Sequence, residues 1–471
     1  MPALNPDVPS EVHDSARLRR GPTRQRVFVI AAIAMFMSTL DLTIVAVALP
    51  AIHHNLHATI NWAGWTITIY GVGIVVALPV AGKFSHQFGR RRVFLYGVAI
   101  FTIASLLCGL ATDIYMLIIF RGVQAIGGGA LQPSAAGLVV DHFGRDRDRA
   151  LGMFGTIAAG GQVLGPVLGG ILVGFLSWRW IFFVNVPVGV ALFSMIAIYI
   201  PESKLSAPSR TDVKGLALLV TFILATIFGI TELGEGHTAV YSPTFLVPEF
   251  VAVVLFVVFL RHSKREKEPF IPARLLHAKG FAVINAEGFF WGAFGFGVAS
   301  LVPLYAEERY HLSALSAGTL LSVRAVGMMA VGAIAAFSLR RTGYRLPMIV
   351  GFSVVGVGTL FMASSPLWGA SPYIWLGLCA GVTGLGNGVA NPASRNACLE
   401  LDPEASSVVV GIRSMFNYLG VIFSVSIVTA ILNRSPNPGL AQAHIYWVAA
   451  GFILLVMVPL VLRVPEHKGT W

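Results

Sequence analysis

The sequence predicts an all-α integral membrane protein with fourteen transmembrane helices. Of its 471 residues, 56% are hydrophobic and 12% are charged, and the mean hydropathy is +0.76. Apolar runs of about 20 residues, each long enough to cross a hydrocarbon layer of roughly 30 Å as a helix, recur from Phe28 almost to the C-terminus. The Lys and Arg residues gather in alternate connections between these runs. A lipid bilayer is therefore the expected solvent.

The apolar runs and polar breaks set the expected spans, in chain order. They lie near residues 27–50, 62–82, 93–112, 114–140, 149–176, 179–201, 213–233, 245–261, 280–305, 314–338, 346–364, 373–396, 406–432 and 443–463. We expect helices because an open sheet would leave backbone groups unpaired in lipid, and the runs lack the alternation of barrel strands.

The loop charges predict how the chain is oriented. Cytoplasmic loops of membrane proteins carry an excess of Lys and Arg. With the N-terminus inside, the expected cytoplasmic segments hold 26 of the 33 Lys and Arg residues, and the outer connections hold three, Arg179, Arg309 and Arg434. This asymmetry persists to the C-terminus, so we expect an even number of spans and both termini in the cytoplasm.

A repeated pattern predicts two related halves. The segment GKFSHQFGRRR, residues 82–92, follows the second span, and SLRRTGYR, residues 338–345, follows the tenth. Each is a short basic turn with a Gly, which indicates two six-helix units with two helices inserted between them. The expected divisions are a tail at 1–26, a bundle at 27–201, inserted helices with a basic linker at 202–279, a bundle at 280–463 and a tail at 464–471.

Several function classes are excluded or disfavoured. The net charge of +11 is scattered among short loops, so it does not indicate nucleic-acid binding. Cys108, Cys379 and Cys398 lack the spacing of a metal site or a disulfide framework. No HExxH, GxSxG or phosphate-binding loop indicates an enzyme. We therefore expect no catalytic residue, cofactor or metal, and a sensor would normally need an output domain.

Charged residues inside the spans are the strongest functional signal, since an unpaired charge in lipid costs several kcal/mol. At 1.5 Å per residue, Asp41 lies about 13 Å and Arg121 about 12 Å from the outer ends of their helices. Glu287 and Arg413 both lie about 11 Å from cytoplasmic helix ends. We expect two buried acid–base pairs, which either carry protons or hold helices together as static contacts.

Other polar residues in the spans are candidates for substrate binding. Arg324 has no acid in its own helix, so it pairs with Glu287, meets an anionic substrate group or faces a water-filled cavity. Arg395 is expected at a helix end, where its side chain reaches the interface. Four amides complete the candidate set and either line a cavity or bond between helices: Gln124, Asn387, Asn391 and Asn417.

Small residues mark a close helix contact in the fifth span. The segment GQVLGPVLGG, residues 161–170, places small residues on one helix face, and its proline permits a kink. The residues of this motif are Gly161, Gly165, Pro166, Gly169 and Gly170.

Five motifs in order resemble the fourteen-span drug/proton antiporters of the major facilitator superfamily. LDLTIVAVALP, residues 40–50, resembles the first-helix signature with its coupling acid, here Asp41, although Ala46 replaces a frequent Asn. RGVQAIGGGA, residues 121–130, resembles the fourth-helix motif whose Arg is linked to proton transfer, and residues 161–170 resemble the antiporter motif of exporters. SWRWIFFVNVPVG, residues 177–189, resembles the start of the sixth span.

The turn at residues 82–92 resembles the superfamily's conserved gating loop. Gly82, Gly89, Arg90 and Arg91 are in register with it, whereas His86 stands where an Asp is usual and introduces a group that titrates near neutral pH. The second half matches less well, because Arg324 lies where some multidrug members carry an acid.

The resemblance implies a proton-coupled exporter of small lipophilic solutes or drugs, working by alternating access as a monomer in the cell membrane of a bacterium. Spans 1, 4, 9 and 12 would line its central cavity. The alternatives are a dedicated exporter of one anionic or lipid-like metabolite and a facilitator without coupling.

Overall fold

The computed structural model describes residues 24–143, 147–201, 212–235, 238–266, 280–367, 369–398, 406–464 and 466. The expected N-terminal tail up to residue 23, the basic linker at 267–279 and nearly all of the C-terminal tail lie outside the described residues. In the described part every regular element is a helix, as the sequence predicts.

The first set of helices runs from α1 to α7. Their bounds are α1 Arg24–Asn55, α2 Ile60–Phe88, α3 Arg90–Gly109, α4 Ile114–Phe143, α5 Arg147–Phe175, α6 Trp180–Phe183 and α7 Asn185–Tyr199. The span expected at 179–201 is divided between α6 and α7 at Val184, which keeps helical backbone angles, and the two helices form one apolar segment, Trp180–Tyr199, long enough to cross a membrane.

Two helices follow, α8 Val213–Gly234 and α9 Pro243–Arg265. The Asp212 side chain accepts a hydrogen bond from the Gly215 N–H and so caps the start of α8. These helices pack against each other, and α8 also contacts α2 and α17. Asn61 of α2 donates to the Thr231 carbonyl, and Asn433 of α17 donates to the Gly234 carbonyl.

The last set of helices is less regular than the spans predict. Its bounds are α11 Phe281–Phe290, η3 Trp291–Gly297, α12 Val298–Ser300, α13 Val302–Tyr310, α14 Ala314–Thr342, α15 Arg345–Ala363, α16 Pro372–Ala397, α17 Ser406–Arg434, α18 Pro438–Phe452, η5 Ile453–Met457 and α19 Val458–Val461. The elements η3 and η5 are π-helical, so the spans expected at 280–305 and 443–463 each contain a wider turn.

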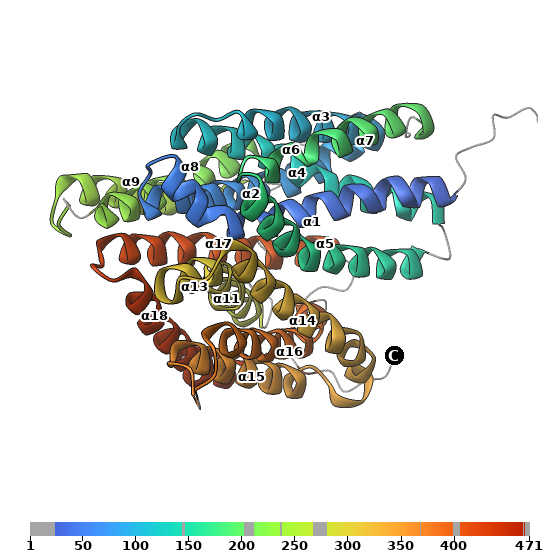
Figure 1. Ribbon diagram of the computed structural model, residues 1–471. Helices are drawn as coiled ribbons and strands as arrows, with labels where there is room; N and C mark the ends of the chain where they lie inside the picture. The colour runs from blue at the N-terminus through green and yellow to red at the C-terminus, as the bar shows by residue number, and fades with distance from the viewer. Residues whose placement is uncertain are drawn as a thin grey trace, which may run out of the picture.

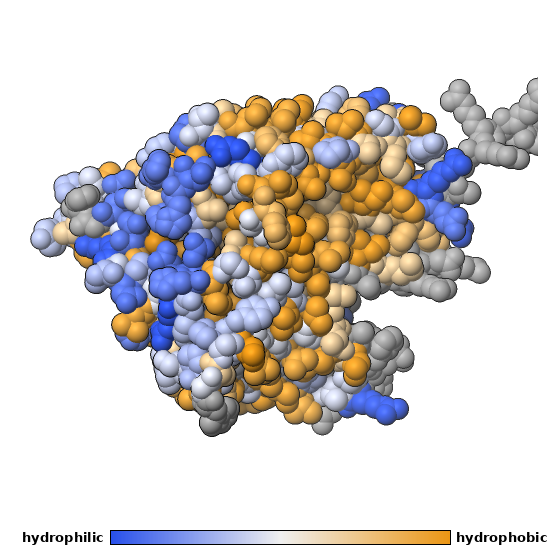
Figure 2. Space-filling model, in the orientation of Figure 1, coloured by the Kyte–Doolittle hydropathy of each residue, from blue (hydrophilic) through white to orange (hydrophobic). Residues whose placement is uncertain are grey.

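Thirteen segments of the described residues are long and apolar enough to cross a membrane, and α5 contributes a shorter apolar segment at Gly160–Phe175. The whole of α5 has 29 residues and packs along α1. Figure 2 shows hydrophobic side chains over the middle of the molecule and hydrophilic ones gathered at its left end. The protein is therefore a multi-pass membrane protein.

The two sets of helices lie one above the other in Figure 1. We call the end where α1 begins the terminus side and the end where α1 finishes the far side. The sets meet through the far halves of their helices: Gly170 of α5 approaches Leu315 of α14, and Gly64 of α2 approaches Thr429 of α17. Towards the terminus side the sets diverge, and Figure 2 shows an indentation in the outline there.

Candidate functional site

Asp41 lies at the centre of a buried polar network in the first set of helices. Its side chain is 0% exposed. One carboxylate oxygen accepts a hydrogen bond from the Arg121 guanidinium at 2.8 Å. The other accepts from the amides of Gln124, at 3.0 Å, and Asn185, at 2.9 Å. The ion pair inferred from helix depth is therefore present, and three residues of two helices, α4 and α7, donate to one carboxylate.

Arg121 is held from several directions. Its guanidinium donates to the Gln124 side chain at 2.6 Å and to the Thr66 carbonyl at 3.2 Å. It also lies 4.0 Å from the centre of the Tyr70 ring, which is close enough for a cation–π interaction. These contacts replace the hydration that the charge loses on burial, so the guanidinium has a fixed position beside Asp41.

Sequence reasoning missed Asn185 and Ser105. Asn185 begins α7 and is 2% exposed, and Ser105 of α3 accepts a hydrogen bond from Gln124 at 2.6 Å. An asparagine inside the apolar segment at 177–189 was the available signal, because a buried amide needs a partner. Ser105 carried no such signal, since a hydroxyl can bond within its own helix.

The second predicted pair is also in contact. Glu287 of α11 and Arg413 of α17 are 2% and 7% exposed, and their charged atoms lie 3.8 Å apart. Ser394 of α16 links them, because it donates to Glu287 at 2.7 Å and accepts from Arg413 at 2.5 Å. The pair is looser than the Asp41–Arg121 pair and depends on this bridging hydroxyl.

Arg324 contacts a backbone carbonyl rather than the Glu287 carboxylate. Its guanidinium donates to the Gly295 carbonyl of η3 and lies 5.5 Å from the centre of the Phe296 ring. Its Nε has no hydrogen-bond partner among the described residues. Gly295 lies in the π-helical turn η3, where backbone hydrogen bonds join residues five apart, so this turn supplies the acceptor for a guanidinium of α14.

The amide candidates differ in their surroundings. Gln124 is fully buried in the Asp41 network, and Asn387 is fully buried and donates to the Thr383 carbonyl of its own helix. Asn417 donates to the Gly288 carbonyl at 3.1 Å and so joins α17 to α11. Asn391 of α16 and Asn417 are both partly exposed. Of the four, these two are therefore the most available to a solute.

The expected gating turn joins α2 to α3. Gly82 lies in the last part of α2, and Gly89 has φ 93°, a backbone conformation that favours glycine and allows the sharp change of direction. Arg90 donates to the Gly137 carbonyl of α4, and Arg91 donates to the Ala197 carbonyl of α7 at 2.7 Å. The side chain of His86 lies outside the described residues.

The small residues of α5 lie against two helices. A Cβ added at Gly161 or Gly165 would overlap the Thr39 or Thr43 hydroxyl of α1. Gly170 and the Pro166 carbonyl instead face α14 of the other set, where Pro166 approaches Gly318. The motif at 161–170 therefore permits close packing within one set and between the two sets.

An apolar cavity of about 430 Å³ lies between α11 and α17. Phenylalanines dominate its lining, and Asn285 is its polar side chain: Phe281, Ala282, Asn285, Ala286, Phe289, Phe290 and Phe416. The cavity shares both helices with the Glu287–Arg413 pair. This arrangement offers a lipophilic molecule apolar contacts near a buried ion pair.

Residues 31–425 match the model of the Major Facilitator Superfamily. The multidrug transporter protein MdtP of Bacillus subtilis is 31% identical over 424 residues, which cover 89% of this chain and 78% of the relative. The riboflavin transporter RibZ of Clostridioides difficile is 26% identical over 453 residues, covering 93% and 97%.

A solved D-xylose–proton symporter superposes with a TM-score of 0.70 at 15% identity, covering 95% of this chain and 99% of the other. This likeness shows the fold. With the family match and the multidrug relatives, it identifies a membrane transporter of small molecules and not an enzyme. The chain belongs to the major facilitator superfamily and, within it, is of the multidrug-efflux type.

Proposed function

We propose that the protein is a proton-coupled exporter of small lipophilic solutes, exchanging an outgoing solute for an incoming proton. The observation that carries this proposal is the buried Asp41, which accepts from Arg121, Gln124 and Asn185. A carboxylate enclosed in this way can bind or release a proton when its donors move. The multidrug transporters among its relatives support the export of such solutes.

The proposed coupling follows from electrostatics. In the state described, the two sets of helices are in contact on the far side and Asp41 is paired with Arg121. When the sets of helices rock and the far side opens, separation from Arg121 removes the positive charge beside Asp41, and the carboxylate takes up a proton from that side. Return to the present state restores the ion pair and releases the proton on the terminus side.

The direction of transport depends on orientation. We propose that the terminus side faces the cytoplasm, because the basic connections lie between helices on that side. The protein then takes solute from the cytoplasm and the adjoining leaflet of the bacterial cell membrane. The acid–base pairs and the apolar cavity all come from one chain, so the proposal requires only a monomer.

The phenylalanine-lined cavity supports a lipophilic substrate. Burial of apolar surface is non-directional, so such a cavity accepts molecules of different shapes. Glu287 and Arg413 form the proposed second proton site beside it. Asn391 and Asn417 supply candidate polar contacts, and the turn at residues 82–92 is the proposed gate on the terminus side.

Arg324 favours a second candidate function, the export of one anionic metabolite. Its Nε has no hydrogen-bond partner in the described part of the chain. A bound anion would supply that partner. The riboflavin transporter is an example of a relative named for a single compound.

The test is transport in proteoliposomes with an imposed pH gradient and a lipophilic fluorescent dye. We expect Asp41→Asn to lose gradient-driven dye movement, because an amide cannot exchange a proton. The matched control is Asp113→Asn, the same change at an exposed residue that caps α4 through the Met116 N–H. Gradient-driven movement retained in Asp41→Asn would refute the coupling.

The same vesicles separate the alternatives. An uncoupled facilitator would equilibrate the dye at equal rates with and without the gradient. For the anionic alternative, Arg324→Ala would lose binding of anionic compounds while retaining binding of neutral dyes, measured by fluorescence titration.

A further inference from the structure

A cluster of imidazoles and carboxylates lies on the far side, outside the transport site described above. His53 and His54 end α1, and Glu308 lies in α13 of the other set of helices. One ligand atom from each of these three residues lies within 4.8 Å of the others. The cluster therefore joins the two sets at the end where they are in contact.

The ring of His53 is held by a backbone contact. Its Nδ1 lies 2.5 Å from the Ala58 carbonyl oxygen, which can only accept a hydrogen bond. Nδ1 must therefore carry the proton, so the neutral ring presents the lone pair of Nε2. A backbone carbonyl that fixes the tautomer and ring orientation is the usual support of a metal-binding histidine.

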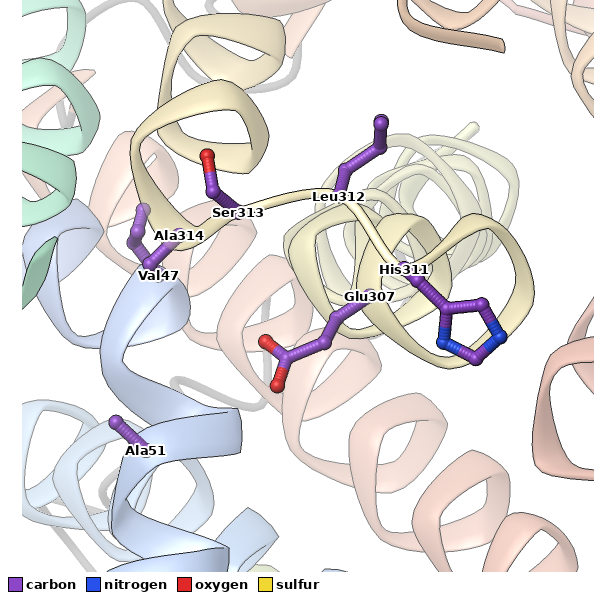
Figure 3. A pocket seen from close by; sticks show the side chains of 7 residues that line it. All are labelled: Val47, Ala51, Glu307, His311, Leu312, Ser313 and Ala314. Atoms are coloured by element: carbon purple, nitrogen blue, oxygen red, sulfur yellow. The ribbon is translucent and has the colours of Figure 1, made fainter.

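The neighbouring charges favour a cation. His54 Nε2 lies 3.8 Å from the Glu307 carboxylate, so a second acid adjoins the three residues. Figure 3 shows Glu307 extending from α13 towards α1. The nearest arginine in sequence, Arg309, lies over the rings of Tyr305 and Tyr310.

The cluster is open to solvent and adjoins a cavity. Glu307, His311 and Ser313 line this cavity of about 370 Å³ together with Val47 and Ala51 of α1. His54 is exposed, and His53 and Glu308 are partly buried. An ion can reach the cluster from water, and a water molecule can complete its coordination.

We propose that His53, His54 and Glu308 bind a divalent transition-metal ion of the zinc type, which links α1 to α13 across the far side. Two imidazoles and one carboxylate with an open position suit Zn²⁺, whereas Mg²⁺ and Ca²⁺ prefer oxygen ligands alone. Because its ligands come from both sets of helices, the bound ion stabilises the state in which the far side is closed.

A second group of imidazole and carboxylate side chains provides an internal control. Asp212, His262 and Glu266 also lie close together. Asp212 already caps α8 and accepts from His262 Nε2 at 2.7 Å. This group thus has a structural role, and removal of His262 leaves the proposed site intact.

The first experiment measures Zn²⁺ binding by the purified full chain in detergent, by calorimetry and by the shift in unfolding temperature. We expect saturable binding that EDTA reverses, and an affinity about tenfold or more lower in His53→Ala and Glu308→Gln. His262→Ala is expected to bind like the wild type. Undiminished binding in both cluster variants, or loss in His262→Ala alone, would overturn the site.

X-ray absorption at the zinc edge tests the ligands without any substitution. The expected spectrum contains two imidazoles with Zn–N distances of about 2.0–2.1 Å. A first shell of oxygen atoms alone would contradict the proposal. Neither measurement uses a proton gradient, so their outcome is independent of the proposed transport function.

The link between the two sets is tested with spin labels at Leu110→Cys and Leu440→Cys. Both side chains are exposed, at the far ends of α3 and α18, and the native cysteines are buried. Zn²⁺ is expected to shift the distances between the two labels towards shorter values when Glu308 is present. No such shift is expected in a Glu308→Gln background. An identical shift in both backgrounds would exclude this link.

Discussion

At the scale of single residues, the geometry of Asp41 decides what the buried charges can do. Its oxygens accept three hydrogen bonds from Arg121, Gln124 and Asn185. These bonds hold the carboxylate in one position while the donors stay in place. Movement of α4 relative to α1 changes the bonds from Arg121 and Gln124, and movement of α7 changes the bond from Asn185. The hydrogen bonding of one carboxylate is thereby tied to the positions of two helices.

Removing Arg121 should reveal how much free energy the burial of the unpaired Asp41 carboxylate costs. We expect Arg121→Leu to lower the free energy of unfolding by about 3–5 kcal/mol, because it leaves an uncompensated carboxylate. Adding Asp41→Asn should recover part of the loss, since the remaining group is neutral. Thermal and denaturant unfolding in detergent measure both changes.

The matched control for Arg121→Leu is Arg395→Leu. Arg395 lies in the last turn of α16 and is exposed, so its removal should change stability by about 1 kcal/mol or less. Equal losses in Arg121→Leu and Arg395→Leu would show that the buried pair has no special energetic role.

Helix depth was enough to predict which charges meet, because a straight helix advances by a fixed rise per residue. It placed Asp41 with Arg121 and Glu287 with Arg413, and both pairs are in contact. It could not predict Ser394 as a bridge, because depth carries no information about which face of a helix a hydroxyl occupies. For the same reason depth leaves Gln124 open between a cavity and a contact between helices, and the structure shows its contacts with Asp41 and Ser105.

At the scale of elements, α5 shows how small residues set the distance between helices. Gly165 lies so close to α1 that any Cβ would overlap the Thr43 hydroxyl, whereas a Cβ at Gly160 would meet nothing within 4 Å. The two positions belong to one helix and differ mainly in what they face. They therefore form a matched pair for substitution.

We expect Gly165→Ala to destabilise the protein by about 1–3 kcal/mol, because the added methyl forces α1 and α5 apart. Gly160→Ala should be neutral or slightly stabilising, since alanine has the higher helix propensity. Unfolding temperatures of the two variants provide the measurement. Equal effects of the two substitutions would mean that α1 and α5 can move apart to accommodate the methyl group without loss of stability.

The existence of the helices was predictable and their internal irregularities were not. Hydropathy indicates how long an apolar segment is and whether it lies in lipid. It therefore predicts a single span at 280–305. In the structure that segment includes the π-helical turn Trp291–Gly297 and a break before Val302. At this turn the backbone of Gly292 lies close to Asn417 of α17, a contact between helices on which hydropathy carries no information.

At the scale of the molecule, the two sets of helices touch mainly along two lateral contacts, with a smaller contact of α1 with α13 and α14. One is formed by α5 with α14 and the other by α2 with α17. Both lie in the far halves of the helices, so a state open to the far side requires both to separate. Blocking either one should stop the cycle.

A disulfide between Gly64→Cys and Thr429→Cys tests this requirement. The Cβ positions lie 3.2 Å apart, close to the spacing that a disulfide needs. We expect oxidation to abolish dye transport in proteoliposomes and reduction to restore it. The control is Gly97→Cys with Ala130→Cys, whose Cβ atoms lie 3.0 Å apart within one set. Continued transport after complete cross-linking of α2 to α17 would contradict the rocking motion.

The position of α8 affects the route by which lipophilic molecules in the bilayer reach the protein. This helix contacts both α2 and α17 and forms hydrogen bonds with each, so it covers one of the two lateral contacts from the surrounding lipid. A molecule dissolved in the acyl chains is thereby kept from that side of the protein. For the proposed exporter we therefore expect entry from the bilayer on one side, through the flank where α5 meets α14. In that proposal, α8 gives the protein a preferred side for sampling the membrane.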